Sequence, residues 1–292
     1  NNAGMYFSGS DDIIVSNNDV DDHSSHGIYF ADSKRIRVKT NEIKNSLGDA
    51  LYLSSNCDSA FIDNNTIKSN GNSVNGRAVR IIEVEDTILY NNTIDSNDYS
   101  GIVITESSNN KIIQNIVKGN GKYGIQILND ATKSANNTIK DNTVNDNSDI
   151  AIFNHGIFTK IINNTVKYNE QDGIKIASDG ARSSISSNNL VDNEGKSIII
   201  LAKNIAIEFN TIDADSSEIA ISILNANFAS IENNTIEGGN LGIKVQNSTS
   251  AFIYNNTIKS NSGYGIQVLI NSESARVKYN QLTDNEDNAI VI

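Results

Sequence analysis

Residues suited to acid–base chemistry gather in the first third of the chain. His26 and Asp49 could form a proton-transferring pair, because a histidine titrates near neutral pH and a neighbouring carboxylate can orient its ring. His23 is a second candidate base close to His26 in the sequence. Arg77 or Arg80 could hold a substrate carboxylate through a two-pronged hydrogen bond. We therefore predict that His23, His26, Asp49 and Arg80 are catalytic.

Tyrosines recur at a fixed interval in the same region. Tyr6, Tyr29 and Tyr52 are each separated by 23 residues, and the face of a tyrosine ring can stack on a pyranose ring. The alternative is a packing ladder, since aromatic residues favour strand positions. With Arg77 and Glu83, which bring charge to the same region, these three tyrosines are the predicted substrate-binding residues.

These residues suit two classes of reaction on a sugar chain. Glycoside hydrolysis needs two carboxylates across the bond that is cut, and Asp49 with Asp21, Asp22 or Glu83 could supply them. We favour hydrolysis on this ground.

Lyase or epimerase chemistry is the second possibility. It needs a base, an acid and a group that neutralises the carboxylate of an acidic sugar. His26, Tyr29 and Arg80 could serve in these roles.

The element that positions these residues is a short repeat with two asparagines, as in Asn64-Asn65-Thr66-Ile67. Its second asparagine, called the anchor here, returns every 22 to 27 residues, a period typical of repeat architectures. The twelve anchors are Asn18, Asn41, Asn65, Asn92, Asn115, Asn142, Asn164, Asn188, Asn210, Asn234, Asn256 and Asn280.

Apolar residues keep fixed offsets from every anchor. The positions three residues before and two residues after it are always Val, Ile or Leu, which indicates a core. A second strand with a small residue followed by an apolar alternation, such as Gly101-Ile102-Val103-Ile104, starts about nine residues after each anchor. Alternation with period two is typical of β-strands.

A further column of asparagine lies five residues after most anchors. Asparagine suits bends because it tolerates left-handed backbone geometry, and stacked amides can bond from one repeat to the next. We therefore predict an all-β, right-handed parallel β-helix of about twelve coils. A leucine-rich horseshoe is the alternative, but it needs a helix or loop where this chain has a second strand.

On these repeats the sequence resembles the pectate-lyase-like β-helix superfamily, in particular NosD-type carbohydrate-binding and sugar-hydrolase repeats. The resemblance covers the whole chain and implies a polysaccharide partner and an extracellular or cell-surface location. Asp21-Asp22-His23 is only faintly similar to the Asp-Pro-His motif of β-helix mannuronan epimerases. Its proline is missing, so no roles are transferred from that motif.

A non-catalytic adhesin stalk that binds glycans or acts as a spacer is the alternative function. In the first four coils, His, Tyr and Arg replace the residues that the repeat has elsewhere, and this favours the enzyme. From Gly156 onward the repeat is regular, which favours a stalk for that half. The chain starts inside one repeat and ends on an apolar strand. Natural arrays carry polar caps, so we expect 1–292 to be a single β-helix domain of a longer protein, with homo-oligomerisation left open.

Charge and cysteine content exclude several other functions. The net charge of −12 argues against a nucleic-acid partner. No apolar run reaches the roughly 18 residues of a membrane helix, so we expect no membrane insertion. The single Cys57 allows no internal disulfide and no cysteine metal cluster. We expect no cofactor. One acidic group near the start of the chain could bind Ca²⁺ through carboxylate oxygens, but we favour a solvated surface there. The group consists of Asp11, Asp12, Asp19, Asp21 and Asp22.

Three further features are open at this level. The longest gaps between anchors carry insertions at 72–76 and 130–133, and insertions in solenoids often form binding loops. Asn154 falls where an inward apolar residue is expected, so either an asparagine is buried or the register shifts by one. His155 has no partner nearby in the sequence, and we expect it at the surface.

Overall fold

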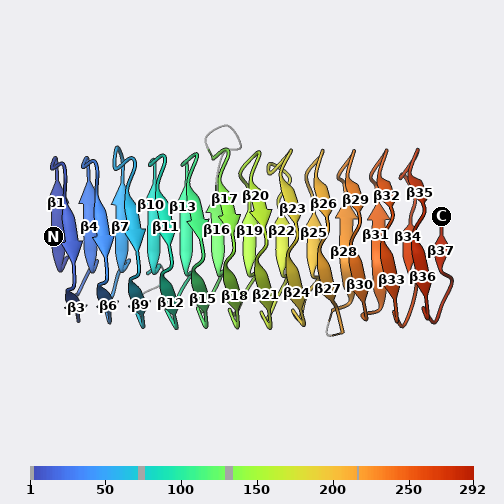
Figure 1. Cartoon of the computed structure of the whole chain (residues 1–292), viewed down its shortest axis with the longest axis horizontal. Coiled ribbons are helices and arrows are strands. Elements are labelled where there is room, and N and C mark those ends of the chain that lie inside the picture. Colours follow the sequence, from blue (N-terminus) through green and yellow to red (C-terminus); the bar gives the residue numbers. More distant parts are fainter. Residues whose placement is uncertain (1–2, 72–75, 129–133, 216) are drawn as a thin grey trace.

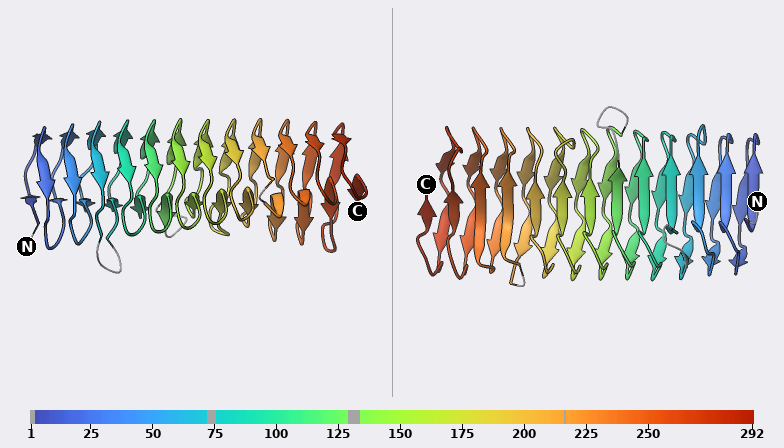
Figure 2. Two further views of the ribbon diagram at one scale, coloured as in Figure 1. Left: turned by 90° about the horizontal axis from the view of Figure 1, so that it is seen from below. Right: turned by 180° about the vertical axis from the view of Figure 1, so that it is seen from behind.

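The computed structural model describes residues 3–71, 76–128, 134–215 and 217–292, and it is an elongated parallel β-helix (Figure 1). Three parallel sheets of 13, 12 and 12 strands run along the whole stack. Each coil contributes one strand to each sheet, and the two ends of the chain lie at opposite ends of the stack (Figures 1 and 2). The described residues contain no helix, and so none that could cross a membrane. The predicted fold is confirmed.

The sheets are named after their first strand. Sheet 1 consists of β1 (Met5–Ser8), β4 (Ile28–Ala31), β7 (Leu51–Ser54), β10 (Val79–Ile82), β13 (Ile102–Thr105), β16 (Ile125–Leu128), β19 (Ile152–Asn154), β22 (Ile174–Ile176), β25 (Ile198–Ile200), β28 (Ile219–Leu224), β31 (Leu241–Gln246), β34 (Ile266–Val268) and β37 (Ile290–Val291). Coil 1 begins with β1, coil 2 with β4, and so on along sheet 1.

Sheet 2 contains the residues that precede each anchor. It consists of β2 (Ile14–Ser16), β5 (Arg37–Lys39), β8 (Phe61–Asp63), β11 (Ile88–Tyr90), β14 (Lys111–Ile113), β17 (Thr138–Lys140), β20 (Lys160–Ile162), β23 (Ser184–Ser186), β26 (Ala206–Glu208), β29 (Ser230–Glu232), β32 (Phe252–Tyr254) and β35 (Arg276–Lys278).

Sheet 3 contains the residues that follow each anchor. It consists of β3 (Asp19–Asp21), β6 (Glu42–Lys44), β9 (Thr66–Lys68), β12 (Thr93–Asp95), β15 (Ile116–Lys118), β18 (Thr143–Asn145), β21 (Thr165–Lys167), β24 (Asn189–Val191), β27 (Thr211–Asp213), β30 (Thr235–Glu237), β33 (Thr257–Lys259) and β36 (Gln281–Thr283).

The core is a column of aliphatic side chains inside the coils. The two predicted apolar positions around each anchor are buried from coil 1 to coil 11, as for Ile62 and Ile67, and are partly buried at Val277 and Leu282 in the last full coil. Burial of each of these aliphatic side chains contributes about 1.5–3 kcal/mol to the free energy of folding. Because successive strand residues point to opposite faces, burying this set fixes which residues of sheet 1 face outward.

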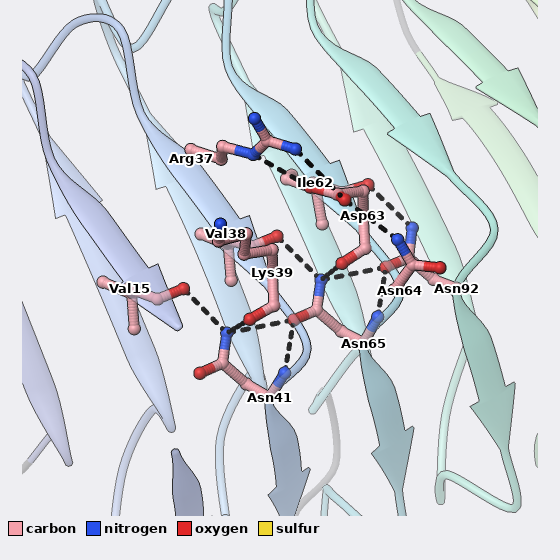
Figure 3. A network of polar contacts seen from close by, with 10 residues as sticks. All are labelled: Val15, Arg37, Val38, Lys39, Asn41, Ile62, Asp63, Asn64, Asn65 and Asn92. Carbon is pink, nitrogen blue, oxygen red and sulfur yellow. Dashed lines mark hydrogen bonds and ion pairs between the residues drawn. The ribbon is translucent and has the colours of Figure 1, made fainter. Parts of the chain in front are cut away.

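The anchor asparagines form a hydrogen-bonded ladder between sheets 2 and 3 (Figure 3). The Nδ2 of Asn41 donates to Oδ1 of Asn65 at 3.0 Å and to the carbonyl of Val15 at 2.9 Å. Asn65 repeats the pattern with Oδ1 of Asn92 at 2.9 Å. The ladder therefore satisfies amides and carbonyls that the bend would otherwise leave unpaired inside the protein.

Left-handed backbone geometry falls one residue before the anchor. Thr40, Asn64 and Asn91 have φ of 54°, 56° and 52°, whereas the anchors themselves do not have positive φ. Asparagine is therefore needed at the anchor for its amide. Its tolerance of left-handed geometry matters at the preceding residue, and only in those coils where that residue is also an asparagine, as at Asn64.

Coil 7 keeps its register although it contains an inward polar residue. Asn154 aligns with Ile127 and Ile176 on the neighbouring strands and is fully buried. Its amide donates to the carbonyl of Gly156 at 2.8 Å and accepts from the Gly156 N–H at 3.1 Å. The irregular coil is thus a buried asparagine. The insertions at 72–76 and 130–133 lie outside the described residues, apart from Gly76.

Candidate functional site

The predicted tyrosines and Arg80 form one column on the outer face of sheet 1. Parallel pairing aligns Tyr6 with Tyr29, Tyr29 with Tyr52, and Tyr52 with Arg80. A second column, in the bend before each strand, contains His26, Asp49 and Arg77. Coils 1 to 4 therefore bring most of the predicted site residues to one face.

The tyrosine rings stack along the axis of the protein. The ring centroids of Tyr29 and Tyr52 are 4.7 Å apart with an interplanar angle of 7°, and those of Tyr6 and Tyr29 are 5.1 Å apart. The guanidinium of Arg80 lies 4.9 Å from the ring centroid of Tyr52. Neighbours thus occupy the faces of the Tyr52 ring, and a ligand would meet ring edges and hydroxyls there. Tyr6, at the end of the stack, is 46% exposed.

Asp49 is the buried centre of the cluster, with a side chain only 2% exposed. Its Oδ1 accepts a hydrogen bond from the main-chain N–H of Arg77 at 2.9 Å, and its Oδ2 accepts one from Arg80 at 3.3 Å. The guanidinium of Arg77 lies 3.8 Å from Oδ1. Asp49 therefore fixes the positions of two arginines, whose side chains are 18% and 29% exposed for Arg77 and Arg80.

His26 contacts both the carboxylate and the tyrosines. Its Nδ1 accepts the main-chain N–H of Asp49 at 3.1 Å and lies 3.7 Å from Oδ2 of the same residue. Its ring centroid is 5.5 Å from that of Tyr29 and 5.2 Å from that of Tyr52. Because Nδ1 accepts a hydrogen bond, the network assigns the proton of the neutral ring to Nε2. The neutral ring therefore offers a hydrogen-bond donor at Nε2.

The tyrosine hydroxyls complete a set of donors. The hydroxyl of Ser54 bonds to that of Tyr29 at 3.1 Å. Burial raises the pKa of the Tyr52 hydroxyl above its usual value, an effect that Arg80 partly offsets. Tyr52 consequently keeps its proton at neutral pH and can donate it to a ligand oxygen.

His23 lies apart from this cluster. It occupies the bend column that Ser46 and Asn70 continue, and its Nε2 lies where a side chain at Gly4 would be. Its carbonyl accepts the N–H of Leu47 at 2.8 Å. No described contact joins His23 to His26 or Asp49. His23 is therefore part of the column of bend residues and not of the cluster around Asp49.

The other predicted carboxylates have partners elsewhere. Asp21 accepts a hydrogen bond from Asn45 at 2.7 Å on sheet 3, and the main-chain N–H of Asp22 bonds to the carbonyl of Lys44 at 3.3 Å. Glu83 follows the end of β10 and accepts a hydrogen bond from Ser55 at 3.0 Å. Glu83 belongs to an acidic pocket of about 320 Å³ whose lining is Asn56, Asp58, Glu83, Glu85 and Glu106.

The acidic group at the start of the chain is paired with basic residues of coil 2. Arg35 contacts Asp12 at 2.6 Å and Asp11 at 3.1 Å, and Lys44 contacts Asp19 at 2.8 Å. Across the described ranges, no three His, Cys, Asp or Glu side chains are grouped so that they could hold a metal ion.

Aromatic and cationic residues continue beyond coil 4, which the sequence analysis missed. Arg77 lies over the ring of Tyr99 at 5.7 Å, and Lys122 lies over Tyr99 and Tyr123 at 4.7 and 5.0 Å. Phe153 follows, 5.5 Å from Tyr123. Together with the column of coils 1 to 4 these residues form a belt along sheet 1. These residues are spread over three neighbouring columns: Tyr99 and Lys122 share one, Tyr123 is in the column of Arg77, and Phe153 is in the column of Tyr52. No single column therefore shows an aromatic repeat beyond coil 4.

His155 has a partner from the next coil. Its Nδ1 lies 2.9 Å from Oδ1 of Asp179, and its ring meets the edge of Phe153 at 4.5 Å. The side chain is 27% exposed, so His155 belongs to the same outer face as the belt.

Solved structures with the same fold include two kinds of protein. The A-module of the mannuronan C-5 epimerase AlgE6 from Azotobacter vinelandii has a TM-score of 0.69 and 11% identity, over 94% of this chain and 80% of that chain. A double mutant of the periplasmic alginate epimerase AlgG has a TM-score of 0.66 and 12% identity, over 92% of this chain and 77% of that chain.

The second kind is an adhesin. PfbA, a surface adhesin of Streptococcus pneumoniae, has a TM-score of 0.63 and 16% identity, over 98% of this chain and 85% of that chain. At these identities the likeness concerns the fold. A search of curated proteins finds no match.

The family whose description reads "Right handed beta helix region" matches residues 3–158, 72–190 and 182–292. These ranges cover the chain almost from end to end, and they agree with the stacked parallel strands and asparagine ladder. The chain therefore belongs to the right-handed β-helix family.

Proposed function

We propose that the outer face of sheet 1 in coils 1 to 4 binds an acidic polysaccharide and acts on its uronate residues. The observation that carries the proposal is the cluster in which buried Asp49 holds Arg80 beside Tyr52 and His26. A guanidinium next to aromatic hydroxyls suits a sugar that carries a carboxylate, because it offers two parallel donors to the two carboxylate oxygens.

Charge supports this choice of ligand. The two guanidinium groups of Arg77 and Arg80 outnumber the one carboxylate of Asp49 and leave an excess of positive charge. This local excess lies on a chain whose net charge is −12. An acidic sugar is therefore attracted to the cluster and repelled by much of the remaining surface.

The reaction that fits these groups is proton transfer at the ring carbon that bears the carboxylate. The C–H bond breaks, a base takes the proton, and the electron pair moves into the carboxylate, where Arg80 stabilises the added charge. Return of a proton to the opposite face gives the epimer. If the glycosidic C–O bond on the adjacent carbon breaks instead, its electron pair leaves with the oxygen, which takes up a proton, and the products are an unsaturated sugar and a shortened chain.

His26 and Tyr29 are the proton carriers of this scheme. In the observed network the N–H of His26 is at Nε2, because Nδ1 accepts the main-chain N–H of Asp49. His26 acts as a base at Nε2 in the other tautomer, in which Nδ1 gives up that hydrogen bond and carries the proton toward Oδ2 of Asp49, 3.7 Å away. Asp49 then acts as a positioning residue, in keeping with its burial.

Glycoside hydrolysis has weaker support. It needs a second carboxylate about 5–9.5 Å from the first across the sugar bond. The described contacts of Asp49 are with His26, Arg77 and Arg80, whereas Asp21 and Glu83 contact Asn45 and Ser55. The pair that hydrolysis requires is therefore not evident around Asp49.

One panel of assays separates these reactions. The protein is incubated with acidic and neutral polysaccharides in D₂O, and three products are followed: deuterium at the ring carbon, ultraviolet absorbance of an unsaturated sugar, and new reducing ends. Deuterium or absorbance on an acidic polymer, lost in His26→Ala, supports the proposal. New reducing ends without absorbance would show hydrolysis instead.

Binding without turnover is the second candidate. It is favoured by one observation: neutral His26, Tyr52 and Arg80 are all donors, and the carboxylate of Asp49 is buried. A surface of donors recognises a carboxylated sugar without needing a base. Tight binding of an acidic polymer with no product in any of the three assays would establish this role.

A further inference from the structure

A second pocket lies on the same face of the β-helix, in coils 8 to 11. It has a volume of about 360 Å³ and is lined by Lys175, Lys196, Ile199, Leu201, Ile219, Ser222, Leu224, Lys244 and Gln246. The strands β28 and β31 are six residues long here, longer than the four or fewer of the other sheet 1 strands. The outer face of sheet 1 is therefore widest at this pocket.

The pocket uses the same columns as the site in coils 1 to 4. Parallel pairing aligns Lys175 with Ile199, Ile199 with Ser222, and Ser222 with Lys244. This is the continuation of the column that contains Tyr29, Tyr52 and Arg80. Ile199 and Ser222 have shorter side chains than lysine and line the bottom of the pocket. Lys175 and Lys244 lie at its two ends.

The third lysine comes from the other column. Lys196 precedes Ser197 and Ile198 in the bend before β25, the position that Asp49 and Arg77 occupy in coils 3 and 4. Like the first site, the pocket thus has cations from both columns. Ile199 and Ser222 take the place that the tyrosines have in the first site.

The cations of the pocket are largely unneutralised. Among the residues that the structure describes, the ammonium groups of Lys196 and Lys244 form no ion pair. Asp172 contacts two of the lysines: its Oδ1 accepts the main-chain N–H of Lys196 at 2.9 Å, and its Oδ2 lies 4.0 Å from the ammonium of Lys175. The lining contains no Asp or Glu. Three lysines converging on one pocket of a chain with 35 acidic residues are the electrostatic complement of an anionic ligand with an apolar face.

We propose that this pocket is a second binding site for an acidic oligosaccharide, occupied by a distant part of the same chain that enters coils 1 to 4. The class of ligand rests on the proposed function. Lysine ammonium groups bind the sugar carboxylates, and Ile199, Leu201 and Leu224 pack against the apolar faces of the rings.

The belt of aromatic and cationic residues connects the two sites. Phe153 of coil 7 contacts Lys175 at 5.6 Å, so the belt leads directly to the edge of the pocket. Strands in a sheet are about 4.8 Å apart, which places Lys175 about 19 Å and Lys244 about 34 Å from Arg80 along the axis. A sugar chain that spans these distances would engage both sites and gain affinity by linkage.

The test is the length dependence of binding. Oligogalacturonates and oligomannuronates, from disaccharides to chains that span both sites, are titrated into the protein. We expect affinity to rise steeply once the chain reaches from Arg80 to the pocket. The variant K175Q/K196Q/K244Q should lose at least about tenfold for the long chains, since each lysine supplies a charge-assisted hydrogen bond, and should lose little for disaccharides.

A matched control removes the same charge elsewhere. The variant K111Q/K160Q/K278Q alters exposed lysines of β14, β20 and β35 on sheet 2. It should keep the steep rise with chain length. A rise that persists unchanged in K175Q/K196Q/K244Q, or a rise that the control variant loses equally, would overturn the proposal.

A second measurement reports on the pocket directly. Long oligouronates should protect Lys175, Lys196 and Lys244 from acetylation in the wild-type protein and in Arg80→Gln, whereas neutral oligosaccharides should not. Protection in Arg80→Gln without proton exchange in the wild-type protein would mean that the pocket binds while the first site does no chemistry. Equal acetylation with and without oligouronate would refute the pocket and leave the first site to its own assays.

Discussion

The main-chain N–H of Asp49 donates a hydrogen bond of 3.1 Å to Nδ1 of His26, the equivalent residue of the preceding coil. This bond sets the tautomer of the histidine and connects it to a carboxylate that also holds Arg80. Asp49 thus determines the tautomer of His26 in the preceding coil and the position of Arg80 in the following coil.

The first prediction concerns Asp49→Asn. Asparagine keeps the shape of the side chain but removes the charge that holds Arg77 and Arg80. We expect turnover on an acidic polymer to fall at least about a hundredfold, because the orientation of His26 and Arg80 is lost. We also expect the free energy of unfolding to fall by about 1–2 kcal/mol, after allowance for the partial exposure of both arginines.

The expected loss of stability has a structural reason. The reason is the burial of Asp49, which is 2% exposed. Asp19→Asn is the matched control, since the Asp19 side chain is 62% exposed in its ion pair with Lys44 and its replacement should change stability by less than about 0.5 kcal/mol. Equal stability of both variants in urea denaturation would contradict the account of Asp49.

The second prediction concerns the tyrosine column. Tyr29→Ala and Tyr52→Ala should each weaken the binding of oligouronates by about 1–2 kcal/mol, since ring edges and hydroxyls are lost. Tyr90→Ala, on the outer face of sheet 2, should leave affinity unchanged. If the Tyr29→Ala, Tyr52→Ala double variant binds as well as wild type, the column only packs.

The third prediction follows from the raised pKa of Tyr52, whose usual value is 10.0. The folded protein holds this proton to higher pH than the unfolded chain does. The resulting stabilisation is complete below pH 10 and is lost as the pH rises from there through the folded pKa. Tyr52→Phe should therefore lose less stability than wild type over that alkaline range. Parallel stability curves for the two proteins would count against a buried, protonated Tyr52.

The fourth prediction concerns the asparagine ladder. Asn142 is 1% exposed, donates to Asn164 at 3.0 Å and accepts from the N–H of Asn115 at 2.9 Å. Asn142→Leu removes these bonds and should lower the free energy of unfolding by about 1–3 kcal/mol. Asn189→Leu, at an exposed strand position, is the control and should have little effect. A wild-type denaturation midpoint in Asn142→Leu would contradict the structural role of the ladder.

The fold could be predicted because the repeat specifies it twelve times. Each anchor, such as Asn65, comes with an apolar residue at fixed distances before and after it, and parallel in-register stacking is the arrangement that buries all of these residues together. The bend geometry could be assigned only in part, because left-handed φ falls on Asn64 and not on Asn65.

The sequence predicts which site residues are neighbours only where they occupy the same column of the repeat. Equivalent residues of successive coils are neighbours, so the contacts of His26 with Asp49 and of Tyr52 with Arg80 follow from the repeat. His23 and Glu83 lie away from the cluster because they occupy other columns: His23 continues into Ser46, and Glu83 follows the end of β10. Whether the bend residues His26 and Asp49 point inward or outward does not follow from strand alternation. The pocket of coils 8 to 11 was missed because Ile199 and Ser222 are ordinary strand residues, significant only beside the lysines.

The most direct test of the central claim is calorimetric titration of wild-type protein and Arg80→Gln with an oligouronate and with a neutral oligosaccharide of the same length. Arg35→Gln, which removes an exposed arginine paired with Asp11 and Asp12, is the control for charge. We predict that wild type and Arg35→Gln bind the oligouronate in preference to the neutral sugar, and that Arg80→Gln binds it at least about tenfold more weakly. Equal affinity of wild type and Arg80→Gln, or equal binding of the neutral sugar, would contradict the account.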